Sequence, residues 1–504
     1  MTNSQRVIVN TIAQYTRTII NVCLSLYSTR LILSVLGQSD YGIYSVVAGV
    51  VAMLSFVTNA LVITTQRYLS FHHGKKDINQ VRLVFGNSWL LHLFLGILVV
   101  IVLGVLGPWI TQNFLNIEDV RRDAAMFVYF AAVAMVLLSF ITAPIRALFI
   151  ARENIVYTSF VDVLDGVLKL SIAILLSKIT YDHLIAYSGL LTGISIFNLL
   201  AFAVYAAIKF PEFHLPKLQE LDKEYMKGLS NFAGWTIYST GCVIARNQGI
   251  SVVLNLFYGT IVNSAYGIAM QVSGAVQFVS TSIVNAMNPQ IMKAEGAGER
   301  QKMIRLCAYE SKYAFLLLAM VVIPLIAEME TILHVWLGEV PVHAVMFCRF
   351  ILIAALCDQI SIGWTSANQA IGKIRTYSII FYTLKLFVIL IAWWCLNIGL
   401  PIISVMWGYV AIEFIGSFVR LPLMKHIANI PITPFFKNVF LRIIGPLATM
   451  VVVCYSSAIL IDIPYRLIIT FSCSLVVGVL SIWGFALNIE EKQYVKNIIK
   501  KLKK

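Results

Sequence analysis

Long apolar stretches follow one another along almost the whole chain, separated by short polar or glycine-containing breaks. A helix needs about 20 mostly apolar residues to cross the roughly 30 Å of bilayer hydrocarbon. By this measure the sequence predicts about 14 spanning helices. The first seven cover residues 7–36, 41–70, 83–106, 123–145, 155–177, 184–208 and 228–257. The next seven cover residues 262–292, 304–326, 344–371, 374–397, 402–424, 440–460 and 465–487.

Composition supports this interpretation. Hydrophobic residues make up 59% of the chain and charged residues 12%, whereas about a quarter of the residues of a soluble protein are charged. So few charges cannot cover a water-exposed surface, which excludes a soluble multidomain enzyme. The sequence therefore predicts an all-α polytopic membrane protein.

The distribution of lysine and arginine predicts the orientation. Loops on one side carry only Arg121, Arg122, Lys178 and Arg466, and the other loop cations lie on the opposite side. Because cytoplasmic loops are enriched in lysine and arginine, both termini are predicted to be cytoplasmic. The net charge of +14 is spread over short loops and a tail, so it indicates membrane topology and anionic lipid, not nucleic acid.

An internal repeat suggests two halves. The segment Tyr41-Gly42-Ile43, with Val47, Gly49 and Val51, recurs as Tyr266-Gly267-Ile268, with Val272, Gly274 and Val276. Both copies open a predicted helix of the same direction. We expect two pseudo-repeated six-helix lobes around a central cavity, an arrangement used for alternating access. The expected parts are an N-terminal lobe (1–209), an inter-lobe linker (210–227), a C-terminal lobe (228–427), two further spans (428–487) and a basic amphipathic tail (488–504).

Polar side chains follow one face of the first predicted span. They are spaced three or four residues apart, as one face of a helix requires: Asn10, Gln14, Arg17, Asn21, Ser25 and Ser28. In lipid such a face lines a hydrated cavity or bonds to a neighbouring helix. Both interpretations stay open, and the cavity is favoured.

Further candidate binding residues lie in the seventh and eighth spans. They are Arg246, Asn247, Gln277 and Asn285. Arginine suits phosphate because its planar fork binds two oxygens, and amides suit sugars. Arg67 and Arg420 lie near inside ends, and Arg30 and Arg349 near outside ends, where long side chains reach the membrane surface. Arg30 and Arg67 are kept as secondary cations of the cavity.

Buried acids are the candidates for ion coupling. Glu310 and Asp358 have no evident cation on their own helix, so either could carry a proton or Na⁺, and pairing with Lys312, Lys385 or another helix is the alternative. The sequence contains no G-x-x-x-x-G-K-[ST] phosphate-binding motif. It suggests no catalytic residue, no metal site and no cofactor other than the coupling ion.

Several motifs resemble those of bacterial polysaccharide transporters, the O-antigen and capsule flippase branch of the multidrug/oligosaccharidyl-lipid/polysaccharide (MOP) exporter superfamily. These motifs are Leu33-x-x-Leu36-Gly37-x-x-Asp40-Tyr41-Gly42-Ile43-Tyr44, Gln66-Arg67-Tyr68-Leu69-Ser70, Gly74-Lys75 and Ala143-Pro144-Ile145-Arg146-Ala147-Leu148-x-Ile150-Ala151-Arg152-Glu153.

The resemblance implies transport of an undecaprenyl-pyrophosphate-linked oligosaccharide across the bacterial inner membrane for polysaccharide biosynthesis. By analogy, cavity arginines such as Arg17 and Arg246 would hold the pyrophosphate, and pathway glycosyltransferases and a polymerase would be partners. Two alternatives stay open: an ion-coupled multidrug or small-molecule exporter of the same superfamily, and a membrane-embedded glycan polymerase or ligase. The acids, histidines and arginines of the longest outside loops show no recognisable catalytic spacing, which disfavours the enzyme.

Overall fold

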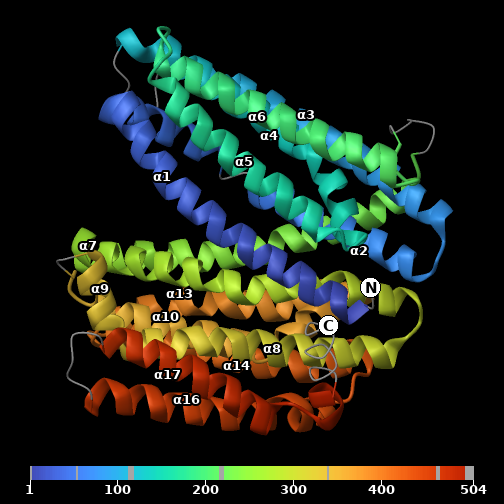
Figure 1. The fold of residues 1–504 in the computed structure, drawn as a ribbon, viewed down its shortest axis with the longest axis vertical. Helices are drawn as coiled ribbons and strands as arrows, with labels where there is room; N and C mark the ends of the chain where they lie inside the picture. The colour runs from blue at the N-terminus through green and yellow to red at the C-terminus, as the bar shows by residue number, and fades with distance from the viewer. Residues whose placement is uncertain are drawn as a thin grey trace, which may run out of the picture. The chain divides into compact units, whose positions relative to one another are not determined.

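The computed structural model describes residues 3–52, 55–109, 111, 119–214, 221–337, 340–460 and 466–493. The regular elements in these ranges are all helical, as predicted (Figure 1). The first are α1 (Asn3–Ala52), α2 (Ser55–Gly74), α3 (Ile78–Trp109), α4 (Arg122–Ala151), α5 (Ile155–Leu176), α6 (His183–Lys209) and α7 (Lys223–Gly296). The later ones are α8 (Arg300–Ala327), α9 (Met329–Leu337), α10 (Ala344–Gln359), α11 (Ile362–Ile371), α12 (Ile374–Tyr377), η4 (Ser378–Tyr382), α13 (Thr383–Asn397), α14 (Ile403–Ala428), α15 (Thr433–Phe435), η5 (Phe436–Phe440), α16 (Leu441–Leu460), α17 (Arg466–Ser481) and η6 (Ile482–Ala486).

The predicted number of spans is only partly reproduced. Within the described residues, nine helices are long and apolar enough to cross a membrane, and a tenth is counted when α10 and α11, which meet at 46°, form one broken span. Helix α5 is not among them because it carries Asp162, Asp165 and Lys169. The chain is a multi-pass membrane protein, and the count of 14 stays a prediction.

Two predicted breaks behave differently. Gly37 interrupts α1 with φ 74° and ψ 174°, a conformation that glycine adopts without a steric cost. Helical residues instead continue across the break predicted at Tyr258-Gly259-Thr260, because α7 runs to Gly296. The short helix α9 lies where the sequence predicted only a loop. Most of the predicted 488–504 tail lies outside the described residues.

The chain divides into two compact units. Unit 1 comprises Met1–Thr240 and Met292–Glu299, and unit 2 comprises Gly241–Ile291 and Arg300–Lys504. The division falls within α7. Its first part, up to Thr240, and its last residues, from Met292 on, belong to unit 1, whereas the stretch Gly241–Ile291 between them belongs to unit 2. The lobe boundaries expected from the sequence stay a prediction.

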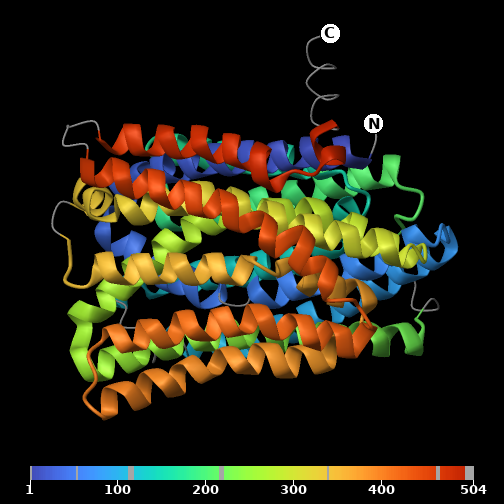
Figure 2. The ribbon, with the colours of Figure 1, turned by 90° about the horizontal axis from the view of Figure 1, so that it is seen from below.

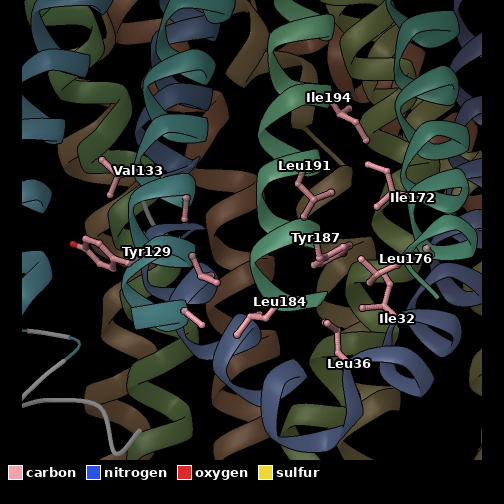
Figure 3. Close-up of a cluster of buried hydrophobic side chains, with 14 of the residues drawn as sticks. Ile32, Leu36, Tyr129, Val133, Ile172, Leu176, Leu184, Tyr187, Leu191 and Ile194 are labelled. Carbon is pink, nitrogen blue, oxygen red and sulfur yellow. The ribbon is translucent and has the colours of Figure 1, made fainter. Parts of the chain in front are cut away.

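Unit 1 is built around α1, α4, α5 and α6. Tyr187, Leu191 and Ile194 of α6 face Ile172 of α5 and Ile32 of α1 in one buried cluster (Figure 3). Within a bilayer such contacts stabilise the helix arrangement through van der Waals packing, because lipid tails are as apolar as these side chains. These contacts fix α1 against α5, the helices that carry Arg17 and Asp162.

The end of α7 crosses α2 in unit 1 at two glycines. A Cβ atom on Gly74 would overlap the carbonyl oxygen of Lys293, and one on Gly296 would overlap that of Phe71. Only glycine allows backbones to approach so closely. An ion pair of 2.6 Å between Lys293 Nζ and Glu153 Oε1 joins the same α7 segment to the turn after α4.

Unit 2 packs around α8, the most buried of its candidate spans. The last two long helices, α16 and α17, lie side by side (Figure 2) and both contact α8. Two ion pairs attach this part of the chain to α8, and the acidic partner of each is buried. Lys312 Nζ contacts Glu491 Oε1 at 2.6 Å, and Arg466 Nη2 contacts Glu328 Oε2 at 3.1 Å just beyond the other end of α8. The C-terminal helices are therefore an integral part of this unit.

Candidate functional site

A polar cavity of about 270 Å³ lies within unit 2, among α7, α8, α10, α13 and α14. Five charged side chains line it: Arg246 of α7, Asp358 of α10, Lys385 of α13, and Glu413 and Arg420 of α14. We call these five residues the unit 2 charge cluster. Three are cations and two are carboxylates, so the cluster carries one excess positive charge.

Each carboxylate of the unit 2 charge cluster has its own arginine. Glu413 Oε1 accepts a hydrogen bond from Arg246, and Asp358 Oδ1 accepts one of 2.8 Å from Arg420 Nη2. Lys385 Nζ bridges the two acids, at 3.0 Å from Asp358 Oδ1 and 2.8 Å from Glu413 Oε2. Arg246, Lys385, Glu413 and Arg420 are buried, and such charges are tolerated in a membrane helix only when paired.

Arg420 also caps the C-terminal end of α10. Its Nη1 donates to the backbone oxygen of Asp358 at 2.6 Å and to Ser361 Oγ at 3.3 Å, and its guanidinium lies 4.3 Å from the Phe381 ring centroid. The last carbonyls of a helix lack partners within it, so a cation at this position satisfies them. The prediction that Arg420 extends to the membrane surface is wrong, because only 2% of it is exposed.

The π-helical turn η4 shapes the same cavity. Phe381 and Tyr382 of η4 line it beside Lys385, and Phe381 packs against Gly416, where a Cβ would lie 3.2 Å from the ring. A π-helical turn is typical of functional sites because it changes the direction of side chains within a helix. The break between α10 and α11 and this turn form part of the cavity wall.

A second polar cavity, of about 520 Å³, lies within unit 1. It is lined by Arg17, Thr18, Asn21, Val22, Ser25, Asp162 and Asp165. Arg17 Nη1 donates to Asp162 Oδ2 at 2.7 Å, and Arg146 Nη2 of α4 donates to the same oxygen at 3.0 Å. Asp165 contacts Lys169 Nζ at 2.7 Å and accepts a hydrogen bond of 2.7 Å from Asn198.

Several residues of the predicted polar stripe face α5 or the turn before it. Asn21 Nδ2 donates to the Asp162 backbone oxygen at 3.2 Å, Asn10 Nδ2 donates to the Glu153 backbone oxygen at 3.0 Å, and Gln14 is buried. The stripe thus contributes to helix packing at several positions and to the unit 1 cavity at Arg17, Asn21 and Ser25.

The other predicted residues are distributed differently. Gln277 lines the unit 2 cavity, and Asn247 Oδ1 accepts from Arg246 Nε at 3.0 Å. Asn285 is exposed and does not line that cavity. Arg67 is buried, with its guanidinium 4.5 Å from the Tyr68 ring centroid. The side chain of Arg30 lies outside the described part.

The two predicted coupling acids differ in their surroundings. Asp358 pairs with Lys385 and Arg420, so the predicted alternative of pairing applies to it. Glu310 is fully buried on α8 and accepts one hydrogen bond of 2.7 Å from Ser366 of α11. Among the described residues, no three histidine, cysteine or acidic side chains are placed to hold a metal.

Sequence reasoning missed Arg146, Lys385, Glu413 and Arg420 as site residues. Arg146 was assigned to an inside loop because the predicted span ends at residue 145, yet α4 continues to Ala151. The other three lie in apolar spans, and only their contacts with residues far away in the sequence reveal their position. The available signal in the sequence was a charged residue within a predicted span, because such a residue needs a partner.

Of the comparisons with known proteins, only the comparison with solved structures found similar proteins. No protein family model and no curated protein sequence matches the chain. A MOP superfamily transporter from Pyrococcus furiosus superimposes with a TM-score of 0.72 over 86% of this chain and 97% of its own, at 12% identity; its binding pocket is described as having reverse polarity.

Two further structures match similarly. A MATE protein in the bent conformation has a TM-score of 0.74, with 13% identity over 87% of this chain and 98% of its own. An outward-facing multidrug resistance MATE family transporter of the MOP superfamily has a TM-score of 0.70, with 14% identity over 84% of this chain and 96% of its own. This multi-pass membrane protein therefore has the fold of MOP superfamily transporters.

Proposed function

We propose that the protein is a MOP superfamily transporter that moves an undecaprenyl-pyrophosphate-linked oligosaccharide from the cytoplasmic to the outer leaflet of the bacterial inner membrane. The fold shared with transporters supports transport. The motifs that resemble polysaccharide transporters support the choice of substrate. In this proposal both termini are cytoplasmic, and glycosyltransferases and a polymerase of the same pathway make and use the substrate.

The unit 2 charge cluster is the observation that carries the proposal. Its excess positive charge lies in a cavity where Coulomb interactions are stronger than in water. Two of its three cations are arginines, which bind phosphate oxygens in pairs. The same cavity is lined by hydroxyl and amide groups suited to sugars: Ser273, Gln277, Ser280, Thr281 and Gln359. This combination matches an anionic, sugar-bearing ligand.

Alternating access requires an energy source, and Glu310 is the candidate proton site in this proposal. Its carboxyl group is fully buried and accepts one hydrogen bond from a serine, and no ion pair to it occurs among the described residues. Buried carboxyl groups in membrane helices are typical carriers of a coupling proton. Asp358 is the weaker candidate because two cations already contact it.

Export of cationic small molecules is the second candidate function. The unit 1 cavity favours it, because Asp162 and Asp165 line that cavity with a single cation, Arg17. The multidrug resistance MATE family transporter among the structural neighbours points the same way. However, both aspartates are already paired, Asp162 with two arginines and Asp165 with Lys169.

A binding experiment separates the two functions. Ligands that bind the folded state raise the unfolding temperature, so the purified full chain is heated in detergent with undecaprenyl pyrophosphate, with uncharged undecaprenol or with tetraphenylphosphonium. We expect stabilisation by undecaprenyl pyrophosphate alone. Stabilisation by tetraphenylphosphonium alone would favour the exporter, and equal stabilisation by undecaprenol would show that the lipid chain, not the charge, is recognised.

A further inference from the structure

Two arginines from different helices converge on one carboxylate in unit 1. Arg17 of α1 places Nη1 2.7 Å from Asp162 Oδ2, and Arg146 of α4 places Nη2 2.9 Å from Asp162 Oδ1. Asp162 itself lies on α5. We call these three residues the Arg17–Arg146 clamp. After pairing, the clamp keeps one unbalanced positive charge.

The arginines of the clamp are more exposed than those of the unit 2 charge cluster. The side chains of Arg17, Arg146 and Asp162 are 28%, 37% and 17% exposed, and Arg17 and Asp162 line the 520 Å³ cavity. A ligand can therefore reach the guanidinium groups without unfolding of the unit. The Arg146 guanidinium also lies 5.1 Å from the Phe202 ring centroid of α6, a contact that does not depend on the charge of Asp162.

The helices around the clamp are held by other contacts. Asn21 binds the backbone oxygen of Asp162, not its carboxylate. Gly166 of α5 lies so close to α1 that a Cβ there would be 2.7 Å from Asn21 Oδ1 and 3.0 Å from Leu24 Cδ1. The α1–α5 contact therefore does not depend on the Asp162 carboxylate, which is free to exchange its partners.

Proteins often bind a phosphate group with two arginine guanidinium groups, as Arg17 and Arg146 here bind one carboxylate. One arginine would be enough to neutralise Asp162. The second leaves an excess charge that the described neighbours do not offset, since Asp165 is held by Lys169 and Asn198. The pyrophosphate linkage of the proposed substrate carries two negative charges, against one for a carboxylate, and offers more acceptor oxygens, so it is the better partner for this pair.

We propose that Asp162 occupies the place of a substrate phosphate, and that the phosphate displaces its carboxylate from Arg17 and Arg146. The inference rests on the proposed function, which supplies the anionic substrate. It assigns Arg146 as a phosphate ligand and Asp162 as an internal competitor. Competition lowers affinity at this site, and a transporter needs weak enough binding to release its substrate again.

The test measures binding of undecaprenyl pyrophosphate to the purified full chain and to four variants. Asp162→Asn removes the competing charge at nearly constant shape, and we expect it to bind about tenfold tighter, because a charged hydrogen bond contributes about 1.5–3 kcal/mol. Arg17→Gln and Arg146→Gln should each bind about tenfold more weakly. Lys178→Ala, which removes an exposed cation just beyond the end of α5, is the control and should bind like the wild type.

The sign of the Asp162→Asn effect decides the outcome. Equal or weaker binding by this variant, with wild-type binding intact, would overturn the competitor role and leave the proposed function standing. Weaker binding of tetraphenylphosphonium by Asp162→Asn, with no binding of the pyrophosphate by any form, would overturn both. If Asp162→Asn does not fold, Arg146→Gln carries the test, and unchanged affinity in that variant would refute the clamp.

Discussion

Replacing Arg420 with alanine is expected to destabilise unit 2 by about 3–5 kcal/mol, the usual cost of breaking a buried ion pair from one side. The change removes the bonds from Arg420 to the Asp358 carboxylate, the Asp358 backbone oxygen and Ser361 Oγ. The C-terminal carbonyl of α10 then loses its partner at the break before α11. Thermal or denaturant unfolding of the purified protein measures the loss.

Two control variants make the Arg420 prediction specific. Lys425→Ala removes an exposed cation from the same helix and should leave stability within about 0.5 kcal/mol of wild type. Arg420→Lys keeps the charge but not the planar fork, so an intermediate loss is expected. An Arg420→Ala protein as stable as the Lys425→Ala protein would contradict the role assigned to Arg420.

Replacing Arg152 with alanine is expected to destabilise unit 1 by roughly 3 kcal/mol, at the lower end for a broken buried pair. Arg152 binds both oxygens of Glu212, at 2.6 Å each, and Glu212 is fully buried. The loss is limited because His73 Nε2 stays 3.3 Å from Glu212 Oε1. Denaturant unfolding at neutral pH measures the change.

The Arg152–Glu212 pair also makes the stability of unit 1 depend on pH. Burial raises the pKa of Glu212, but the contacts with His73 and Arg152 outweigh this and lower it to about 2, from an ordinary value of 4.5. A carboxylate with a lowered pKa stabilises the fold above its unfolded pKa, and this contribution is lost as the pH falls from about 4.5 to about 2. Glu212→Gln should therefore lose less stability than the wild type over that range, and an identical loss would contradict the assignment.

Hydrophobic pattern and local motifs were enough to predict the helical class and several local features. The break at Gly37 is confirmed by its positive φ. Gly372, predicted to end a span, ends α11 in the left-handed conformation with φ 84°. Lys169 and Asp165 form an ion pair, as their spacing of four residues on one helix favours. In each case the information lies within a few residues of sequence.

The candidate sites could not be derived in the same way, because they depend on contacts between distant helices. Arg420 lies near the end of a hydrophobic span, and nothing nearby in sequence shows that Asp358, 62 residues earlier, ends a helix beside it. Arg17 was selected from the polar face of its span, but its partner Asp162 lies on α5, and the second arginine on that carboxylate, Arg146, lies on α4. Hydropathy identifies which charges are costly, whereas only the fold shows which other charges compensate them.

The central claim is that the protein moves a lipid-linked glycan across the membrane, and the distribution of that glycan between leaflets tests it most directly. Undecaprenyl-linked repeat units are measured in cells without the protein, with a membrane-impermeant glycan reagent that detects only the outer leaflet. The account predicts that the units accumulate and stay inaccessible to the reagent, and that the wild-type protein restores labelling. Unchanged amounts and labelling of lipid-linked glycan, with new sensitivity to small toxic cations, would contradict it.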